Sequence, residues 1–472
     1  MDTEYIYNEL DFVFPAQKFN IQYSYISNKG LPFIREFVLR LVHLAPLSKQ
    51  QVLKYFGLSI SEVDEAISDL VGREELTLSA DGKLTLTAKS SSYFTRIGEL
   101  PRVSNIQDGV ATLSFDLPTF TCVDPSGPRS NWTACLKPEF ELQNMANSEK
   151  MAEKSFQLQF DEILDKGYLK YLQPGDIAER PSVYTVNGVQ KLGQSAFRLK
   201  TNFRMGNGGE TLERDDYDQL NDSELMHGLV TSELSRLLKA NNNVSISKAM
   251  MKIGDADTLE LFDSSNSAIK PIRLDGMNLD ASERTTFVGP VYSLENWEAI
   301  QKLLGPLLLS RATRKSSNEL SKFTWIAPSD AFWGKSDRFS SSFSQFLHRA
   351  STSDAKIYTP LLYVPVSDVG DVRTAKQWKH EFQQEVEHVH GIQEGFLDGN
   401  VEILYFEGQL AVVCYHLVLP EQFPVTVPVG FMTTDKDQVN RIGDLVSEYL
   451  GGISSFDKPH DCGLISSIVR SR

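Results

Sequence analysis

Two carboxylates and an imidazole recur at helical spacing in the segment 377–391, which reads QWKHEFQQEVEHVHG. Glu381, Glu385 and His388 stand at i, i+4 and i+7, so a helix over this segment would carry all three on one face. Carboxylate oxygens and imidazole nitrogens are ligands for divalent cations. The pattern indicates a candidate divalent-metal site that would serve a metal-dependent nuclease or phosphodiesterase. Its alternative is an ordinary solvated polar face.

Positive charge gathers in the segment 302–356, although the whole chain has a formal net charge of −15. The segment holds nine lysines and arginines against four acidic residues, a local charge of +5. Trp325 and Trp333 lie among them, and basic side chains interleaved with aromatic rings can follow a nucleic-acid backbone. Docking of an acidic protein surface and a flexible basic loop are the alternatives. The residues expected to contact nucleic acid are Arg311, Arg314, Lys315, Lys322, Lys335 and Arg338.

Other catalytic patterns are missing from the sequence. The four cysteines form no Cys-x-x-Cys pair and fit no zinc spacing, which favours buried or incidental thiols, and no Gly-x-Ser-x-Gly elbow occurs. No apolar run is long enough to span a bilayer, and the N-terminus MDTEYIYNELDF lacks the apolar stretch of a signal peptide. We therefore expect a cytoplasmic protein with no membrane partner. No cofactor is predicted, apart from the divalent metal considered above.

The clearest elements lie in residues 31–89. Apolar residues at helical spacing predict a first helix, Ser48 can cap a second, and Ser59 with Glu62 has capping-box spacing ahead of a third. Two strand-like runs joined by a tight turn at 80–82 close the segment. Three short helices followed by a β-hairpin resemble a winged helix-turn-helix domain.

The third of these helices is acidic. It carries Glu62, Asp64, Glu65 and Asp69, and only Arg73 offsets them at its end. In a winged helix that reads DNA this helix enters the major groove, where four carboxylates would be repelled by phosphates. We therefore expect this domain to dock against protein or to serve a structural role.

The rest of the chain divides into two patterns. Residues 93–240 are β-rich with some helices, and Asn187-Gly188 predicts a hairpin turn. From residue 241 to 472, strand-like and helix-like runs alternate, which predicts an α/β layer with a partly parallel sheet. The expected class is α/β for this last part and multidomain α+β overall, with a winged-helix domain and N-terminal extension over 1–92.

The segment 400–450 reads as strand, tight turn, two strands and a capped helix, and it resembles the C-terminal half of a phospholipase D-like domain. That family uses a His-x-Lys, a following Asp and an Asn to attack and hold a phosphoryl group. With Glu407 in the Asp position, the His position holds Asn400 and the Lys position holds Glu402. A carboxylate at 402 would repel phosphate instead of binding it. The resemblance therefore implies a degenerate, non-catalytic module.

Three functional hypotheses follow. The first is a non-catalytic cytoplasmic adaptor or scaffold with protein partners, and by resemblance winged helices joined to phospholipase D-like modules occur in bacterial DNA-processing and phage-defence systems. The second is a metal-dependent nuclease or phosphodiesterase using Glu381, Glu385 and His388. The third is direct DNA binding through the basic segment 302–356.

Overall fold

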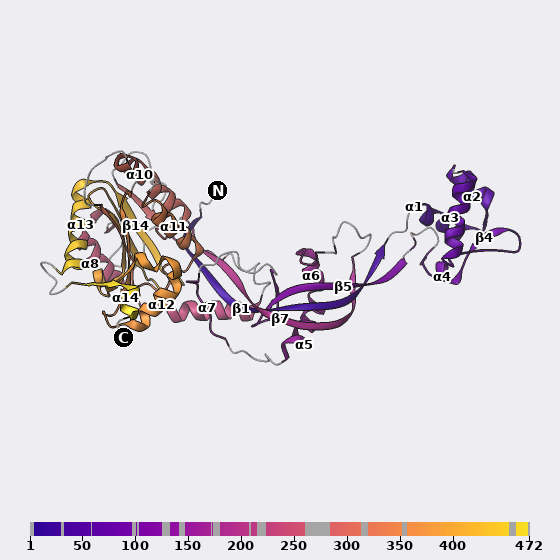
Figure 1. Ribbon diagram of the computed structural model, residues 1–472, viewed down its shortest axis with the longest axis horizontal. Helices are drawn as coiled ribbons and strands as arrows, with labels where there is room; N and C mark the ends of the chain where they lie inside the picture. The colour runs from indigo at the N-terminus through magenta and orange to yellow at the C-terminus, as the bar shows by residue number, and fades with distance from the viewer. Residues whose placement is uncertain are drawn as a thin grey trace. The chain divides into compact units, whose positions relative to one another are not determined.

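The computed structural model is a multidomain α+β protein, as the sequence predicts, with two compact units (Figure 1). Unit 1 comprises Met1–Phe14, Pro128–Glu141 and Arg198–Arg472, and unit 2 comprises Pro15–Gly127 and Leu142–Phe197. The expected domains 1–92, 93–240 and 241–472 divide the chain differently and stay a prediction. The structure describes residues 4–29, 33–57, 59–96, 101, 103–124, 133–140, 147–170, 172, 180–206, 209–214, 223–259, 284–312, 320–351, 356–452 and 459–470.

Unit 2 includes a small group of helices with its own sheet. The helices are α1 (Phe33–Leu44), α2 (Lys49–Phe56), α3 (Ile60–Gly72) and α4 (Ala88–Ser91), and the strands β2 (Leu47–Ser48), β3 (Leu76–Leu78) and β4 (Lys83–Leu86) pair in the order β2-β4-β3. Ser48 caps α2 and Ser59 begins α3 with a capping box, as predicted, and Ser48 forms a capping box with Gln51 as well. Val38, Ile67 and Leu84 lie in the shared core. The predicted helices and hairpin are present, and their assignment to the winged-helix family stays a prediction.

A second sheet has the order β6-β5-β1-β7. Its strands are β1 (Tyr5–Lys29), β5 (Val103–Asp116), β6 (Cys122–Val123) and β7 (Ser182–Met205), and α5 (Ser148–Leu158) and α6 (Phe160–Asp165) share a core with it in unit 2. The hairpin predicted at Asn187-Gly188 is wrong, because both residues continue β7. Gly188 lacks the positive φ that the predicted two-residue turn requires, so the strand runs straight through it.

Unit 1 is built on a mixed sheet of eight strands in the order β15-β11-β10-β9-β12-β13-β14-β8. β9, β10 and β11 are parallel, and the remaining pairs are antiparallel, which agrees with the predicted partly parallel layer. The strands are β8 (Arg284–Val288), β9 (Lys322–Ile326), β10 (Thr359–Val366), β11 (Val389–Gln393), β12 (Val401–Phe406), β13 (Leu410–Leu417), β14 (Val427–Thr433) and β15 (Asp461–Leu464).

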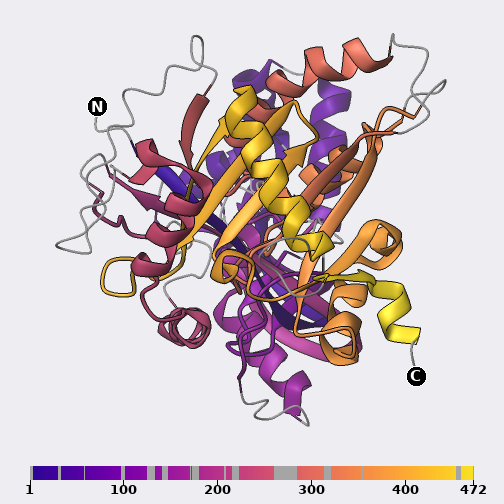
Figure 2. The same cartoon turned by 90° about the vertical axis from the view of Figure 1, so that its left-hand side faces the viewer.

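Helices cover both faces of this sheet. α10 (Leu294–Ala312), α11 (Asp337–His348), α12 (Val372–Phe382) and α14 (Ile465–Arg470) share one large core with one face. α8 (Asn243–Ile253) and α13 (Lys436–Gly451) contact the other face, and Figure 2 shows α13 lying across the strands. α7 (Glu224–Leu237) and α9 (Ala256–Leu259) flank α8 in the sequence. Among the described residues no helix is long and apolar enough to cross a membrane.

Candidate functional site

A group of buried polar side chains lies on the face of the unit 1 sheet that α11 covers. It begins at the hairpin of β12 and β13, whose register places Glu402 directly opposite Cys414. Alternate residues of a strand point to the same face, so His416 joins Cys414 on that face. All three residues are buried: Glu402 and Cys414 are 0% exposed, and His416 is 3% exposed.

The Glu402 carboxylate has partners on both oxygens. The indole nitrogens of Trp325 and Trp333 donate to Oε1 at 2.7 and 2.8 Å. Oε2 lies 3.3 Å from Nε2 of His416. Hydrogen bonds to a charged acceptor are stronger than neutral ones, and this carboxylate therefore joins the β9 strand, the turn after it and β13 into one network.

Asp330 fixes the other side of the imidazole. Its Oδ2 lies 2.7 Å from Nδ1 of His416 and accepts a second hydrogen bond from the Thr426 hydroxyl at 2.8 Å. Its Oδ1 accepts from the backbone N–H of Phe332 at 3.0 Å. The ring is thus held between two carboxylates, which determines its orientation.

The charge states follow from these contacts. Burial opposes the imidazolium form, but the hydrogen bonds to Asp330 and Glu402 raise the pKa of His416 well above its ordinary value. Burial likewise disfavours a charged Asp330, but the hydrogen bond from His416 leaves the pKa of that carboxyl below its usual range. Burial raises the pKa of the Cys414 thiol to about 11. These shifts favour a protonated His416 ring beside the Asp330 carboxylate and a neutral Cys414 thiol.

The same atoms form a set of metal donors. One carboxylate oxygen of Glu402, the sulfur of Cys414 and a ring nitrogen of His416 all lie within 4.8 Å of one another, and no other such trio of acidic, cysteine or histidine residues occurs among the described residues. Cysteine spacing along the chain does not reveal this group, because its donors include a single cysteine and come from two strands. The sequence does contain one indication of the group. Cys414 and His416 form a Cys-x-His on one strand, and the tight turn at Glu407-Gly408 places Glu402 of the preceding strand opposite Cys414.

The three positions taken from the phospholipase D-like resemblance do not converge. Glu402 lies in the cluster, whereas the Asn400 side chain donates to Ser245 at 3.0 Å and accepts from Asn242 at 2.9 Å, both beside α8. Glu407 is exposed in the turn after β12 and accepts a backbone hydrogen bond from Lys322 at 2.9 Å.

The three residues predicted to bind a divalent metal, Glu381, Glu385 and His388, do not come together in the structure. α12 ends at Phe382, where Gln383 takes a positive φ of 46°, and a 3-10 helix, η5 (Gln383–His388), follows. The single helix expected over this segment is therefore wrong, and the three side chains lose their common face. Glu381 pairs with Lys335 at 2.8 Å, Glu385 accepts from the Ser344 hydroxyl at 3.4 Å, and His388 lies 3.6 Å from Glu387.

The basic segment divides among α10, β9 and α11. Lys335 is neutralised by Glu381, Arg338 lies 3.5 Å from Glu9, and Lys322 is exposed on β9. The side chain of Arg311, together with Arg314 and Lys315, lies outside the described residues.

The interleaved aromatic rings of this segment belong to the core. Trp325, Phe332, Trp333 and Phe339 are all buried, and the rings of Trp325, Trp333 and Phe339 contact one another in the unit 1 core. Buried rings are not available to stack on bases. The aromatic part of the nucleic-acid pattern is therefore wrong, although the role of the exposed basic residues stays a prediction.

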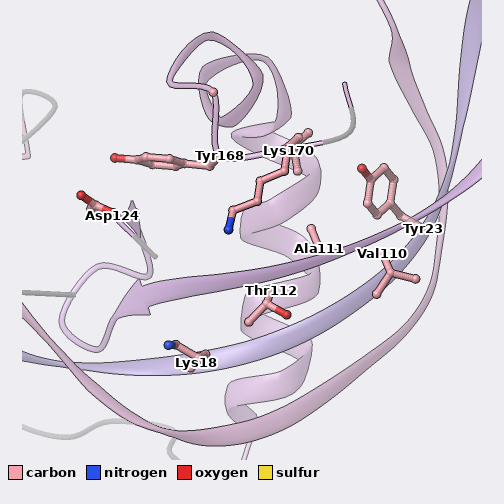
Figure 3. Close-up of a pocket in the computed structure, with 10 residues that line it drawn as sticks. Lys18, Tyr23, Val110, Ala111, Thr112, Asp124, Tyr168 and Lys170 are labelled. Carbon is pink, nitrogen blue, oxygen red and sulfur yellow. The ribbon is translucent and has the colours of Figure 1, made fainter. Parts of the chain in front are cut away.

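Unit 2 contains an open pocket of about 710 Å³ that the sequence did not indicate (Figure 3). Figure 3 shows the ammonium groups of Lys18 and Lys170 and the ring of Tyr168 around it, with Asp124 to one side. Burial raises the pKa of Tyr23, which lines the pocket, to about 12, so this hydroxyl stays protonated. The volume lies within the range of small-molecule sites, and two ammonium groups beside aromatic rings suit an anionic, partly apolar ligand.

Comparisons with known proteins do not assign a family. No protein-family model matches the chain, and no curated protein matches it. Among solved structures, the chain is similar to phosphatidylserine synthase from Haemophilus influenzae Rd KW20, with 9% sequence identity and a TM-score of 0.21. The match covers 35% of this chain and 38% of that one, well under two thirds of its length. A TM-score this low carries no argument about fold or activity, so the phospholipase D-like assignment stays a prediction.

Proposed function

We propose that the protein is a non-catalytic adaptor or scaffold subunit of a larger complex. The observation that carries this proposal is the state of Glu402, which is 0% exposed and hydrogen-bonded to two indoles. In the phospholipase D-like resemblance this position would belong to a phosphate-binding lysine. Here it holds an acidic side chain whose oxygens are already engaged, and a substrate would reach it only if the core around Trp325 and Trp333 opened.

The helix-turn-helix of α2 and α3 offers the docking surface of the proposed adaptor. Tyr55 and Ile60 are 70% and 71% exposed there, and Asp64 and Glu65 are exposed on the same helices. A contiguous exposed apolar patch marks an interaction site, and we propose that these two side chains form one. Because the four carboxylates of α3 outnumber the two lysines of α2, the surface suits a protein segment with apolar and basic side chains and disfavours DNA.

Partner capture with matched variants tests the adaptor role. The full chain is used as bait, and Tyr55→Ser with Ile60→Ser is compared with Val244→Ser, which changes a side chain 72% exposed on α8 in unit 1. We expect the double variant to lose a specific partner that the wild type and the Val244 variant retain. Equal recovery by all three baits would contradict docking through α2 and α3.

A phosphodiesterase assay tests the proposal that the protein is not a catalyst. We expect the purified chain to show no turnover of phosphodiester substrates above that of a buffer control. Turnover by the wild type that disappears in Glu402→Gln or Asn400→Ala, with both variants folded by circular dichroism, would overturn the proposal.

A further inference from the structure

We propose that Glu402, Cys414 and His416 bind one zinc ion that serves a structural role in the core of unit 1. The donors come from the two paired strands β12 and β13, and all three are buried. This inference goes beyond the adaptor role, because it concerns the stability of the sheet and not the binding of a partner protein.

The spacing of the donors fits a tetrahedral ion. Zinc bonds to nitrogen and oxygen are about 2.0–2.1 Å long, and tetrahedral geometry then separates two such donors by about 3.3–3.4 Å. Oε2 of Glu402 and Nε2 of His416 are 3.3 Å apart. The Cys414 sulfur lies within 4.8 Å of a carboxylate oxygen of Glu402 and of a ring nitrogen of His416. A tetrahedral zinc ion, with its longer bond to sulfur, would hold the sulfur about 3.6 Å from each of these donors.

The surrounding hydrogen bonds resemble the outer shell of a metal site. A metal-bound histidine usually donates its second ring N–H to a carboxylate, and Asp330 occupies that position at 2.7 Å from Nδ1. Trp325 and Trp333 both donate to Oε1 of Glu402, and Oε2 would exchange its 3.3 Å contact with Nε2 of His416 for a bond to the ion. Glu402 and His416 thus have fixed orientations before any ion enters.

The donor types select zinc over magnesium or calcium. Thiolate and imidazole are soft or borderline ligands, and the hard cations prefer oxygen alone. The thiolate and the Glu402 carboxylate together balance the two positive charges of the ion. Binding displaces the thiol proton of Cys414 and any proton on Nε2 of His416, and both protons go to solvent. A tetrahedral ion would take its fourth ligand from a water molecule.

Metal content of the full chain is the first test. The protein is produced in zinc-supplemented medium, purified without chelator and analysed by mass spectrometry for metals. We expect about one zinc per chain in the wild type and in Cys462→Ser, a half-buried cysteine of unit 1 outside the cluster, and a loss of most of it in Cys414→Ser. Equal zinc in all three proteins would overturn the assignment.

A second test does not depend on a buried substitution. The wild type is unfolded, stripped of metal and refolded with zinc, with cobalt or with neither. We expect zinc to raise the melting temperature and cobalt to give a thiolate-to-cobalt charge-transfer band, since an ion that binds only the folded state stabilises it. Refolded protein that takes up no metal, shows no such band and melts at the same temperature in all three samples would show that the cluster is a hydrogen-bonded network alone.

Discussion

Two regions of this protein contain groups of carboxylates that differ in their exposure to solvent. In unit 1, Asp330 and Glu402 are buried, and each of their four oxygens has a polar partner. In unit 2, the carboxylates of α3 are exposed, and their contacts are local: Asp64 pairs with Lys49, and Asp69 pairs with Arg73 one turn away.

The comparison shows how the fold decides the use of an acidic side chain. A buried carboxylate is stable only where donors and cations are built around it, and removing one partner leaves an uncompensated charge. An exposed carboxylate is solvated, so its pairs contribute little to stability and it remains available to a partner. The first region therefore holds the structure together, and the second offers a surface.

The largest expected effect comes from the buried region. Glu402→Ala removes one charge from a closed network and leaves two indole donors and His416 without their acceptor. We expect the free energy of unfolding to fall by about 3–5 kcal/mol, measured by urea denaturation followed by circular dichroism. Glu65→Ala, an exposed carboxylate of α3, is the control and should change it by less than about 0.5 kcal/mol. Similar losses in the two variants would remove the distinction between the regions.

A smaller loss is expected from one donor of the same network. Trp333→Phe keeps an aromatic ring in the core but removes the N–H that donates to Glu402 at 2.8 Å. Because Trp325 still donates to the same oxygen, we expect a loss of about 1–3 kcal/mol in the same urea experiment. Trp378→Phe provides the control, since its indole donates to the backbone carbonyl of Pro365 outside the cluster. A loss larger than that of Glu402→Ala would mean that packing, and not the hydrogen bond, dominates at Trp333.

Asp371 lies between the two extremes, because it is largely solvated but well hydrogen-bonded. It caps α12 by accepting from the Thr374 N–H, and it also accepts from Ser367. These hydrogen bonds, that from Thr374 first, lower the pKa of Asp371 to about 2. We expect Asp371→Ala to cost about 1 kcal/mol at neutral pH, the usual value of a helix cap.

The pH dependence of this effect has a definite sign. A folded-state pKa below the unfolded value of about 3.9 means that the stabilisation is complete above about pH 5 and is lost as the pH falls through about 2. The difference in unfolding free energy between wild type and Asp371→Ala, measured from pH 6 to pH 2, should shrink in that window. A difference that stays constant would show that the cap is not charge-dependent.

The smallest effect on stability is expected on α3. Asp64→Asn breaks the exposed pair with Lys49, and we expect a change of no more than about 0.5 kcal/mol in unfolding free energy. Under the adaptor proposal the same variant should still weaken the capture of a basic partner. A loss above about 1 kcal/mol in unfolding free energy would show that the Asp64 carboxylate stabilises the fold, as the buried carboxylates of unit 1 do.

Local signals in the sequence predicted local structure well. The capping boxes at Ser48 and Ser59 depend on residues three positions apart, and both are present. The Asn187-Gly188 turn and the helix over Glu385 were also local predictions, but sheet pairing in β7 and the break at Gln383 overrode them. Sequence patterns of this kind carry no information on which strand a segment will pair with.

The buried cluster could be predicted only in part. The unusual residue at position 402 was visible from the resemblance, but its hydrogen-bond partners Trp325, Trp333 and His416 are 77, 69 and 14 residues away along the chain. Their convergence depends on β12 pairing with β9 and β13, which follows from the whole sheet. The prediction that Trp325 and Trp333 face nucleic acid was wrong for the same reason, since their burial also depends on the whole sheet.

The four tryptophans among the described residues, Trp297, Trp325, Trp333 and Trp378, belong to unit 1, while tyrosines are present in both units. Two of these indoles donate to the buried Glu402. Light absorbed selectively by tryptophan therefore excites these four indoles of unit 1, and an emission spectrum recorded during denaturation would register the opening of the unit 1 core. The chain thus carries a built-in optical probe that can reveal whether its two parts unfold together or one after the other.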